Sequence, residues 1–289
     1  MTYARIMASV RALQSVELSD FWAEFEAVMG GTDGLMTYRY LGTHAHALDR
    51  HHATGSLRLR SDLRGEHGLM AAPLTILVAD VIGILDDAIA VPAPTQIALE
   101  IVDDGAGVDE VYCVGEMFHE GRSQLFSRAR LVDASDHDRV LAVCRDAGAV
   151  MAPAPEGYHY VDPGPGVPDS PSLPPLWQAF GAVRRPDGGL EIPELTGRIG
   201  STSGSLHHGP TQIVLETAAT EAAVGAAGTD ALRLRHWHVT FSARGTIGPF
   251  VTTTEVVGAR GDAVVVEAEL RDEGVGRLIA AASAVFERI

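Results

Sequence analysis

The sequence contains no lysine and no asparagine, and all 22 of its basic residues are arginine. Set against 38 aspartate and glutamate residues, this leaves a formal net charge of −16 at pH 7. Proteins that bind nucleic acid or an anionic membrane need a positive surface, so the balance argues against both partners. A few clustered arginines would still hold a small anionic ligand. Both missing residue types have AT-rich codons, which indicates a GC-rich, bacterial genome.

Cysteine is nearly as scarce, with only Cys113 and Cys144, each in an apolar, strand-like stretch. Two isolated thiols make no disulfide framework, so we expect buried, unpaired side chains in a reducing compartment. No apolar run reaches 18 residues without a charge, and residues 1–20 lack the apolar core and cleavage site of a secretory signal. We therefore expect a soluble, cytoplasmic protein.

Proline, in contrast, is concentrated in one segment, PAPEGYHYVDPGPGVPDSPSLPPL (153–176). Proline fixes φ and removes a backbone donor, so neither a helix nor a central strand is expected at this density. We interpret residues 153–188 as an extended linker that divides the chain into two halves.

The two halves share a pattern. GLMAAPLTILVADVIGILDD (68–87) and SLHHGPTQIVLETAATEAAVG (205–225) each place a proline at the start of an apolar run, Pro73 and Pro210, at an offset of 137 residues. Proline suits the first turn of a helix, where its missing N–H is not needed. Each run therefore predicts a long buried helix with an acidic residue six or seven positions after its proline, Asp80 or Glu216.

Strand-like segments surround each helix, rich in β-branched and apolar residues with turn residues between them. One lead-in segment precedes each helix and four segments follow it. In the first half they are 54–63, then 96–102, 110–118, 124–133 and 139–151. In the second half they are 190–199, then 232–241, 250–258, 263–272 and 277–286.

This order predicts an α+β protein of tandem repeats, each an antiparallel sheet wrapped around a long central helix. The predicted units are an N-terminal helix and lead-in (1–53), a first repeat (54–152), the linker, and a second repeat (189–289). Two unrelated α+β domains are the alternative. Within the first unit, residues 21–31 predict a short amphipathic helix, and residues 38–52 an extended segment.

The pattern resembles the hotdog-fold thioesterase superfamily in its tandem, double-hotdog form. The residues that carry the resemblance are HHGPTQIVLETAA (207–219), APLTILVADVIG (72–83), and the C-terminal pair VEAELRD (266–272) and RLIAAASAVF (277–286). In the phenylacetate-type branch of the superfamily, a His-Gly-Gly turn opens the central helix, and an Asp or Glu follows about nine positions after the histidine. The resemblance thus implies tandem hotdog repeats and an acyl-CoA thioesterase.

The same resemblance implies a mechanism. The backbone N–H after the histidine polarises the thioester carbonyl, and the carboxylate of the opposite helix acts as a general base on water, or as a nucleophile. A helix N-terminus offers unpaired N–H groups and a partial positive charge, which suit an oxyanion. A carboxylate in a partly apolar cleft gains a raised pKa and becomes a useful base.

The motif positions fall at 208–210 (His-Gly-Pro) in the second half and at 71–73 (Ala-Ala-Pro) in the first, which lacks the histidine. Nine positions after Ala71 comes Asp80. The resemblance therefore implies one composite site, with Asp80 from the first helix and His208 and the Gly209 amide from the second.

A mirror site would pair Ala72 with Glu216 or Thr217. Thr217 stands nine positions after His208, and Glu216 stands one place early. We keep Glu216 as a candidate catalytic residue and Thr217 as a candidate substrate contact, and we expect the mirror site to be degenerate.

The sequence departs from the family at several positions. Proline in the third motif position removes one N–H in each half, which leaves Gly209 as the remaining donor. The family's asparagine before the turn is absent, so Ser201, Thr202 or Ser203 would replace it. The family's serine or threonine on the strand after the helix corresponds loosely to Thr95, a candidate substrate contact.

Residues 119–124 (HEGRSQ) predict a hairpin with Gly121 at its turn. Its Arg122 is a candidate contact for a coenzyme A phosphate, with a solvated turn arginine as the alternative. Histidines cluster at 44, 46, 51 and 52 and again at 236 and 238, but without a recognised ligand spacing. We predict no metal site.

The sequence thus predicts an acyl-CoA thioesterase without a cofactor, coenzyme A being part of the substrate. A non-catalytic acyl-CoA-binding or regulatory protein on the same fold is the alternative. A hydratase ranks last, because the Asp and His five apart that such hotdog proteins carry are not found. Homo-oligomers of double-hotdog units are possible partners.

Overall fold

The computed structural model describes residues 21–30, 35–154, 156–157 and 159–289. The predictions for residues 1–20 and for Gly31 lie outside these ranges. The helices are α2 (Phe21–Gly30), α3 (Thr37–Leu41), α4 (Ala71–Asp86), α5 (Leu176–Ala179) and α6 (His208–Ala227), with a 3-10 turn at Ser61–Leu63. The strands are β1 (His44–Ala47), β2 (His52–Arg58), β3 (Arg64–Gly65), β4 (Gly68–Leu69), β5 (Ala90–Ile101), β6 (Glu110–Glu120), β7 (Gln124–Asp133), β8 (Asp136–Pro153), β9 (Val183–Arg184), β10 (Leu190–Ile192), β11 (Leu232–Phe241), β12 (Phe250–Arg260), β13 (Ala263–Asp272) and β14 (Arg277–Arg288).

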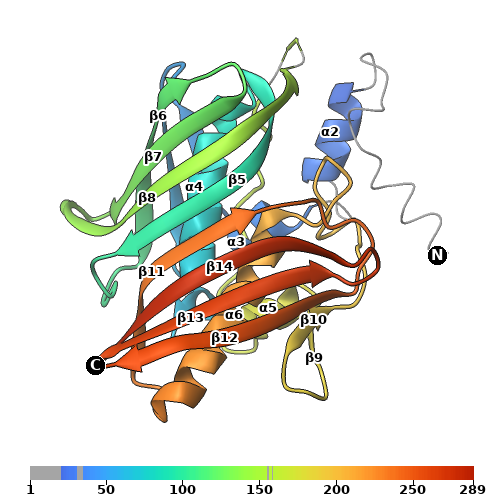
Figure 1. The fold of residues 1–289 in the computed structure, drawn as a ribbon. Helices are drawn as coiled ribbons and strands as arrows, with labels where there is room; N and C mark the ends of the chain where they lie inside the picture. The colour runs from blue at the N-terminus through green and yellow to red at the C-terminus, as the bar shows by residue number, and fades with distance from the viewer. Residues whose placement is uncertain (1–20, 31–34, 155, 158) are drawn as a thin grey trace.

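Twelve of these strands form one antiparallel sheet in the order β1-β2-β6-β7-β8-β5-β11-β14-β13-β12-β10-β9, and β3 and β4 pair separately. The seam between the two halves is the pair β5–β11, where Leu99 lies opposite Trp237. Because β5 and β11 are paired, the two halves share one continuous sheet (Figure 1). Outward from this pair, the first half continues with β8, β7, β6, β2 and β1, and the second half continues in the corresponding order with β14, β13, β12, β10 and β9.

The two long helices pack on this sheet and against each other. Helix α4 contacts β1, β2, β5, β6, β7 and β8, whereas α6 contacts β10, β12, β13 and β14. Figure 1 shows α4 behind the strands of the first half and α6 behind those of the second. Nearly every side chain of α4 is buried, as expected for a helix that is apolar on all sides.

Glycines on β2 and β6 allow α4 to lie close to the sheet. A Cβ atom at Gly55 would overlap Val81 Cγ2 and the carbonyl oxygen of His44, and one at Gly115 would lie 2.8 Å from Val81 Cγ1. The contact of Val81 with the two strands thus depends on the missing side chains. This helps to fix the depth at which α4 lies, and α4 carries Asp80.

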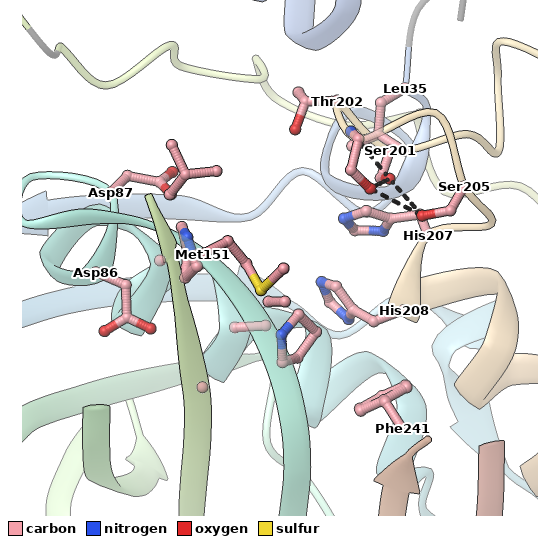
Figure 2. A pocket seen from close by; sticks show the side chains of 18 of the residues that line it. Leu35, Asp86, Asp87, Met151, Ser201, Thr202, Ser205, His207, His208 and Phe241 are labelled. Carbon is pink, nitrogen blue, oxygen red and sulfur yellow. Dashed lines mark hydrogen bonds between the residues drawn. The ribbon is translucent and has the colours of Figure 1, made fainter. Parts of the chain in front are cut away.

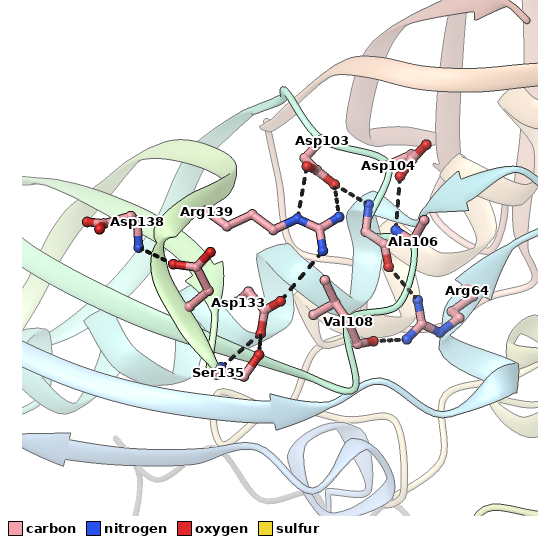
Figure 3. A network of polar contacts seen from close by, with 11 residues as sticks. Arg64, Asp103, Asp104, Ala106, Val108, Asp133, Ser135, Asp138 and Arg139 are labelled. Carbon is pink, nitrogen blue, oxygen red and sulfur yellow. Dashed lines mark hydrogen bonds and ion pairs between the residues drawn. The ribbon is translucent and has the colours of Figure 1, made fainter.

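At one end of the first half, charged residues tie loops to strands. Arg139 on β8 donates to both carboxylate oxygens of Asp103, at 2.7 and 3.1 Å, and its guanidinium lies 3.6 Å from Asp133 (Figure 3). Arg64 donates to the carbonyl oxygens of Gly105 and Val108 in the same loop. These charges hold the β5–β6 connection in place.

The sequence predicted most of these elements. The segments 124–133, 232–241 and 263–272 coincide with β7, β11 and β13. Helices α4 and α6 lie at the two expected places, each with its proline in the first turn. The hairpin around Gly121 is also confirmed, since Gly121 N–H donates to the carbonyl oxygen of Gln124. Cys113 and Cys144 are buried and unpaired, as expected.

The prediction of an extended segment at 38–52 was wrong at its start, because residues 37–41 form α3. Tertiary packing against the start of α6 outweighs the weak helix propensity of its threonine and tyrosines. The lead-ins are also shorter than expected, with β10 ending at Ile192. The predicted linker ends in ordered structure, since it includes α5 and β9. In the described part of the chain, no helix has the length and apolar character needed to cross a membrane.

We expect Gly55→Ala to lower the free energy of unfolding by about 1–3 kcal/mol, because the added methyl group pushes α4 away from β2. Gly225→Ala is the matched control. Gly225 is exposed on α6 with open space around its Cα, so alanine there should raise stability by about 0.5–1 kcal/mol. Chemical denaturation measures both, and equal stabilities for the two variants would contradict the close approach of α4.

Candidate active site

A cavity of about 470 Å³ lies between the two halves of the chain. Its walls are the C-terminal half of α4, the start of β5, the loop before α6 and the loop after β11. Much of the lining is apolar, including Ile82, Val91, Met151, Phe241 and Ile279. The volume is in the range of small-molecule sites, and Figure 2 shows polar groups gathered at the start of α6 on one side of it.

Asp80, the predicted general base, lies on α4 and lines this cavity. Its side chain is 6% exposed, and the hydroxyl of Tyr160 donates to its Oδ2 at 3.1 Å. Burial raises the pKa of Asp80 to about 6, although the hydrogen bond from Tyr160 opposes the shift. Asp80 can therefore take up a proton near neutral pH. Tyr160 comes from the proline-rich segment, in which no site residue was predicted.

Two histidines line the cavity where α6 begins. His207 caps the helix, since its Nδ1 accepts from Gly209 N–H at 3.3 Å and also lies 3.1 Å from the hydroxyl oxygen of Thr37. Nε2 of His208 lies 3.0 Å from the hydroxyl oxygen of Tyr38 on α3. Burial lowers the pKa of His208 to about 4 and that of His207 well below its usual value. Both rings are therefore neutral at pH 7.

His208 was predicted as a site residue, whereas His207 and Tyr38 were not. His207 was visible as the neighbour of His208, but the family motif assigns a role to only one histidine. Tyr38 carried no signal, because it lies in the segment that was predicted to be extended.

The Gly209 amide does not have the predicted place in the site. Its N–H donates to His207, and Gly209 is not among the residues that line the cavity. The absence of a side chain is explained by packing, because a Cβ at Gly209 would meet Thr37, with the hydroxyl oxygen at 2.9 Å. This glycine allows α3 to approach α6, and thereby places Tyr38 beside His208.

Glu216, the candidate of the mirror site, lies outside the cavity and is 3% exposed. Its two carboxylate oxygens accept from the N–H groups of Ala71 and Ala72, each at 2.6 Å. Burial raises its pKa to about 7, against the effect of these two hydrogen bonds. Glu216 on α6 therefore caps the N-terminus of α4, and the position expected for a second site is filled by the protein itself.

Of the three candidate substrate contacts, one lines the cavity and two do not. Thr95 lines the cavity, with its hydroxyl donating to the carbonyl oxygen of Ala147 at 2.8 Å. Thr217 does not line it and donates to the carbonyl oxygen of Ile213 within α6. Arg122 is exposed in the β6–β7 hairpin and also lies outside the lining. The arginine that does line the cavity is Arg244, which is exposed in the loop after β11.

Hydroxyl groups gather in the loop before α6, where the family's asparagine was sought. Ser201, Ser203 and Ser205 form a triangle with hydroxyl oxygens 2.8 to 3.1 Å apart (Figure 2). All three line the cavity, as does Thr202. This wall can donate and accept hydrogen bonds.

Three further acids line the cavity, Asp86, Asp87 and Asp146. Burial raises the pKa of Asp87 and of Asp146 to about 7, and that of Asp86 well above its usual value. In the described residues, Oδ1 of Asp86 has no hydrogen-bond partner. The cavity therefore holds carboxyl groups that remain partly protonated at neutral pH.

One group of possible metal ligands occurs among the described residues, Glu66, His67 and Asp230, with Glu66 and Asp230 exposed. None of the three lines the cavity. Four of the clustered histidines lie beside carboxylates. His236 is 2.8 Å from Glu100 and His52 is 2.9 Å from Asp49, and two further pairs, His44–Asp162 and His51–Glu120, are each 3.3 Å apart.

Solved structures resemble this chain over most of its length. The tesB protein of Mycobacterium avium subspecies paratuberculosis superposes with a TM-score of 0.60 at 14% identity, covering 85% of this chain and 96% of that one. An acyl-CoA thioesterase II, TesB2, of Mycobacterium marinum gives 0.57 at 13% identity, covering 88% and 98%. A protein of unknown function with a hot dog fold from Alicyclobacillus acidocaldarius gives 0.56 at 10% identity, covering 88% and 97%.

The chain has the hotdog fold. The resemblance stated from the sequence is confirmed at this level, because likenesses at such identities show the fold alone. No family model matches this hotdog chain, and no curated protein matches its sequence.

We expect Glu216→Gln to lower the free energy of unfolding at pH 8 by about 2–3 kcal/mol, because one amide N–H of α4 then faces the NH₂ group of glutamine. Thr217→Val, which removes a hydroxyl bonded within the same helix, is the control and should cost less. Urea denaturation measures the free energy of unfolding of both variants. An unchanged value in Glu216→Gln would contradict the capping role.

Asp146 makes stability depend on pH. Its pKa is 3.8 in an unfolded chain and about 7 in the folded protein, so the folded state holds an extra proton between these values and its stability falls as pH rises through them. We expect the stability of Asp146→Asn, relative to the parent, to increase from pH 4 to pH 8. Thermal unfolding of both proteins at several pH values measures this difference in stability. The exposed Asp136→Asn is the control, and parallel profiles for Asp146→Asn and the parent would contradict the shift.

Proposed function

We propose that this hotdog protein hydrolyses an acyl thioester of coenzyme A, with Asp80 as the general base. The observation that carries the proposal is the shared cavity, in which a buried carboxyl group with a pKa of about 6 faces the same space as the start of α6. We also interpret the fold as two hotdog repeats joined at β5–β11, with Asp80 contributed by the first repeat and the histidines by the second. One of the similar structures, that from Mycobacterium marinum, is an acyl-CoA thioesterase, which agrees with this choice.

In the proposed reaction, Asp80 removes a proton from water while the water oxygen bonds to the thioester carbon. The π-electron pair of the carbonyl moves to its oxygen and then returns, and the C–S bond breaks. The sulfur leaves with the bonding pair and takes the proton from Asp80. The products are a carboxylic acid and a thiol, and Asp80 is ionised again.

The cavity suggests how the substrate lies. The apolar wall of Ile82, Met151 and Phe241 suits an acyl chain, and the exposed Arg244 is placed to meet a phosphate of the carrier. Arg244 therefore replaces Arg122 as the proposed phosphate contact. The acids Asp87 and Asp146 on the same cavity disfavour an acyl chain that ends in a carboxylate.

A non-catalytic acyl-CoA-binding protein is the second candidate. The observation that favours it is the hydrogen bond from Gly209 N–H to His207, because it removes the backbone donor on which the family mechanism depends. Such a protein would be stabilised by acyl-CoA without releasing thiol.

We expect Asp80→Asn to lower kcat for thiol release by about 100-fold or more, because asparagine cannot accept the proton. The rate of the parent should fall as pH drops through about 6, since a protonated Asp80 is no base. A thiol-release assay over short, long and aromatic acyl-CoA esters measures both.

Asp109→Asn, on an exposed loop, is the matched control and should keep full activity. Unchanged turnover in Asp80→Asn would contradict the proposed base. No release from any ester, together with thermal stabilisation by acyl-CoA, would favour the binding protein instead.

A further inference from the structure

The hydrogen bonds at the start of α6 fix the protonation of His207. The backbone N–H of Gly209 can only donate, so Nδ1 of His207 is an acceptor and carries no hydrogen. The Thr37 hydroxyl, 3.1 Å away, then donates to the same nitrogen. The neutral ring must therefore carry its hydrogen on Nε2, which makes that atom a donor.

A second chain of contacts fixes His208 in the same way. The indole Nε1–H of Trp237 can only donate, so the atom it meets at 3.3 Å is the amide oxygen of Gln212. This orients the NH₂ group of Gln212 towards Nδ1 of His208, at 3.4 Å. His208 therefore carries its hydrogen on Nε2 and donates it to the hydroxyl oxygen of Tyr38.

Tyr38 is thus left with a hydrogen that His208 cannot accept. In the described part of the chain its hydroxyl has no hydrogen-bond partner other than His208. Burial, and next the charges of Asp80 and Asp87, raise the pKa of Tyr38 well above its usual value, so the hydroxyl keeps its proton. Tyr38 lines the cavity with Asp80 and with both histidines.

Tyr38 and His207 lie beside each other. Their ring centroids are 5.4 Å apart with the rings nearly perpendicular, and Figure 2 shows the two imidazoles projecting from the start of α6 towards Met151 across the cavity. Two side-chain donors of fixed polarity thus occupy the region where the family motif would supply a backbone amide.

We propose that the hydroxyl of Tyr38 and Nε2–H of His207 form an oxyanion hole made of side chains, which holds the carbonyl oxygen of the thioester. This inference rests on the proposed function. Gly209 N–H cannot serve, because it is bonded to His207, whereas the two side-chain donors have no other acceptor among the described residues. Trp237 and Gln212 act as positioning residues, since they set the direction in which Tyr38 donates.

Tyr38→Phe removes the donor and keeps the ring. It should lower kcat about 100-fold or more with little change in KM, because the interaction strengthens as charge develops on the oxygen. Tyr40→Phe is the matched control on the same helix, since Tyr40 packs on Phe180 and does not line the cavity. It should keep full activity.

His207→Asn separates capping from donation. Asparagine can accept from Gly209 N–H as a helix cap, but it has no group in the position of Nε2–H. The variant should therefore unfold near the temperature of the parent and still lose kcat. An unchanged kcat in either Tyr38→Phe or His207→Asn would overturn the proposed hole.

Nitrogen-15 NMR of the histidine rings tests the donor directions without any substrate. We expect both His207 and His208 to carry hydrogen on Nε2, with His207→Asn and His208→Gln assigning the signals. Hydrogen on Nδ1 of either ring would overturn the hole, whether or not the chain has activity. The expected tautomers in a parent that releases no thiol would instead contradict the proposed function while leaving the donor directions in place.

Discussion

The structure depends on how the first amides of two buried helices find acceptors. A helix begins with N–H groups that have no partner within the helix, and burial makes each unpaired group costly. Helix α4 meets this need with the carboxylate of Glu216, which comes from α6. Helix α6 meets it locally, through the imidazole of its own N-cap residue His207. The first solution ties the two helices together, and the second places a histidine on the cavity wall.

The two helix starts differ in what their caps leave unpaired. At the start of α4, the carboxylate of Glu216 and the N–H groups of Ala71 and Ala72 satisfy one another. At the start of α6 the cap leaves Nε2 of His207 unused, and α3 brings Tyr38 within 3.0 Å of His208. The start of α6 therefore contributes polar side chains to the cavity, whereas the start of α4 does not line it.

The sequence predicted the fold well because its signals were local. Alternating apolar residues between turns located β7, β11 and β13, and the prolines located the starts of α4 and α6. The cavity was foreseen less completely than the fold. Asp80 and His208, both implied by the family resemblance, line it, whereas Tyr38 and Tyr160 reach it from separate segments by tertiary packing. The spacing of residues along the sequence also could not reveal that Glu216 caps α4. That role depends on how α6 packs beside α4 in the folded protein.

The position of the Glu216 carboxylate, between the first two amides of α4, determines what those amides can bind. A pair of amides that grips a carboxylate in two 2.6 Å hydrogen bonds would suit the acid that thioester hydrolysis releases. Here the acid is a covalent part of the chain, so its effective concentration at the amides far exceeds that of any solute. The amides at the start of α4 are therefore occupied by the chain's own carboxylate. Under the proposed function, this leaves the start of α6 as the helix terminus that receives substrate.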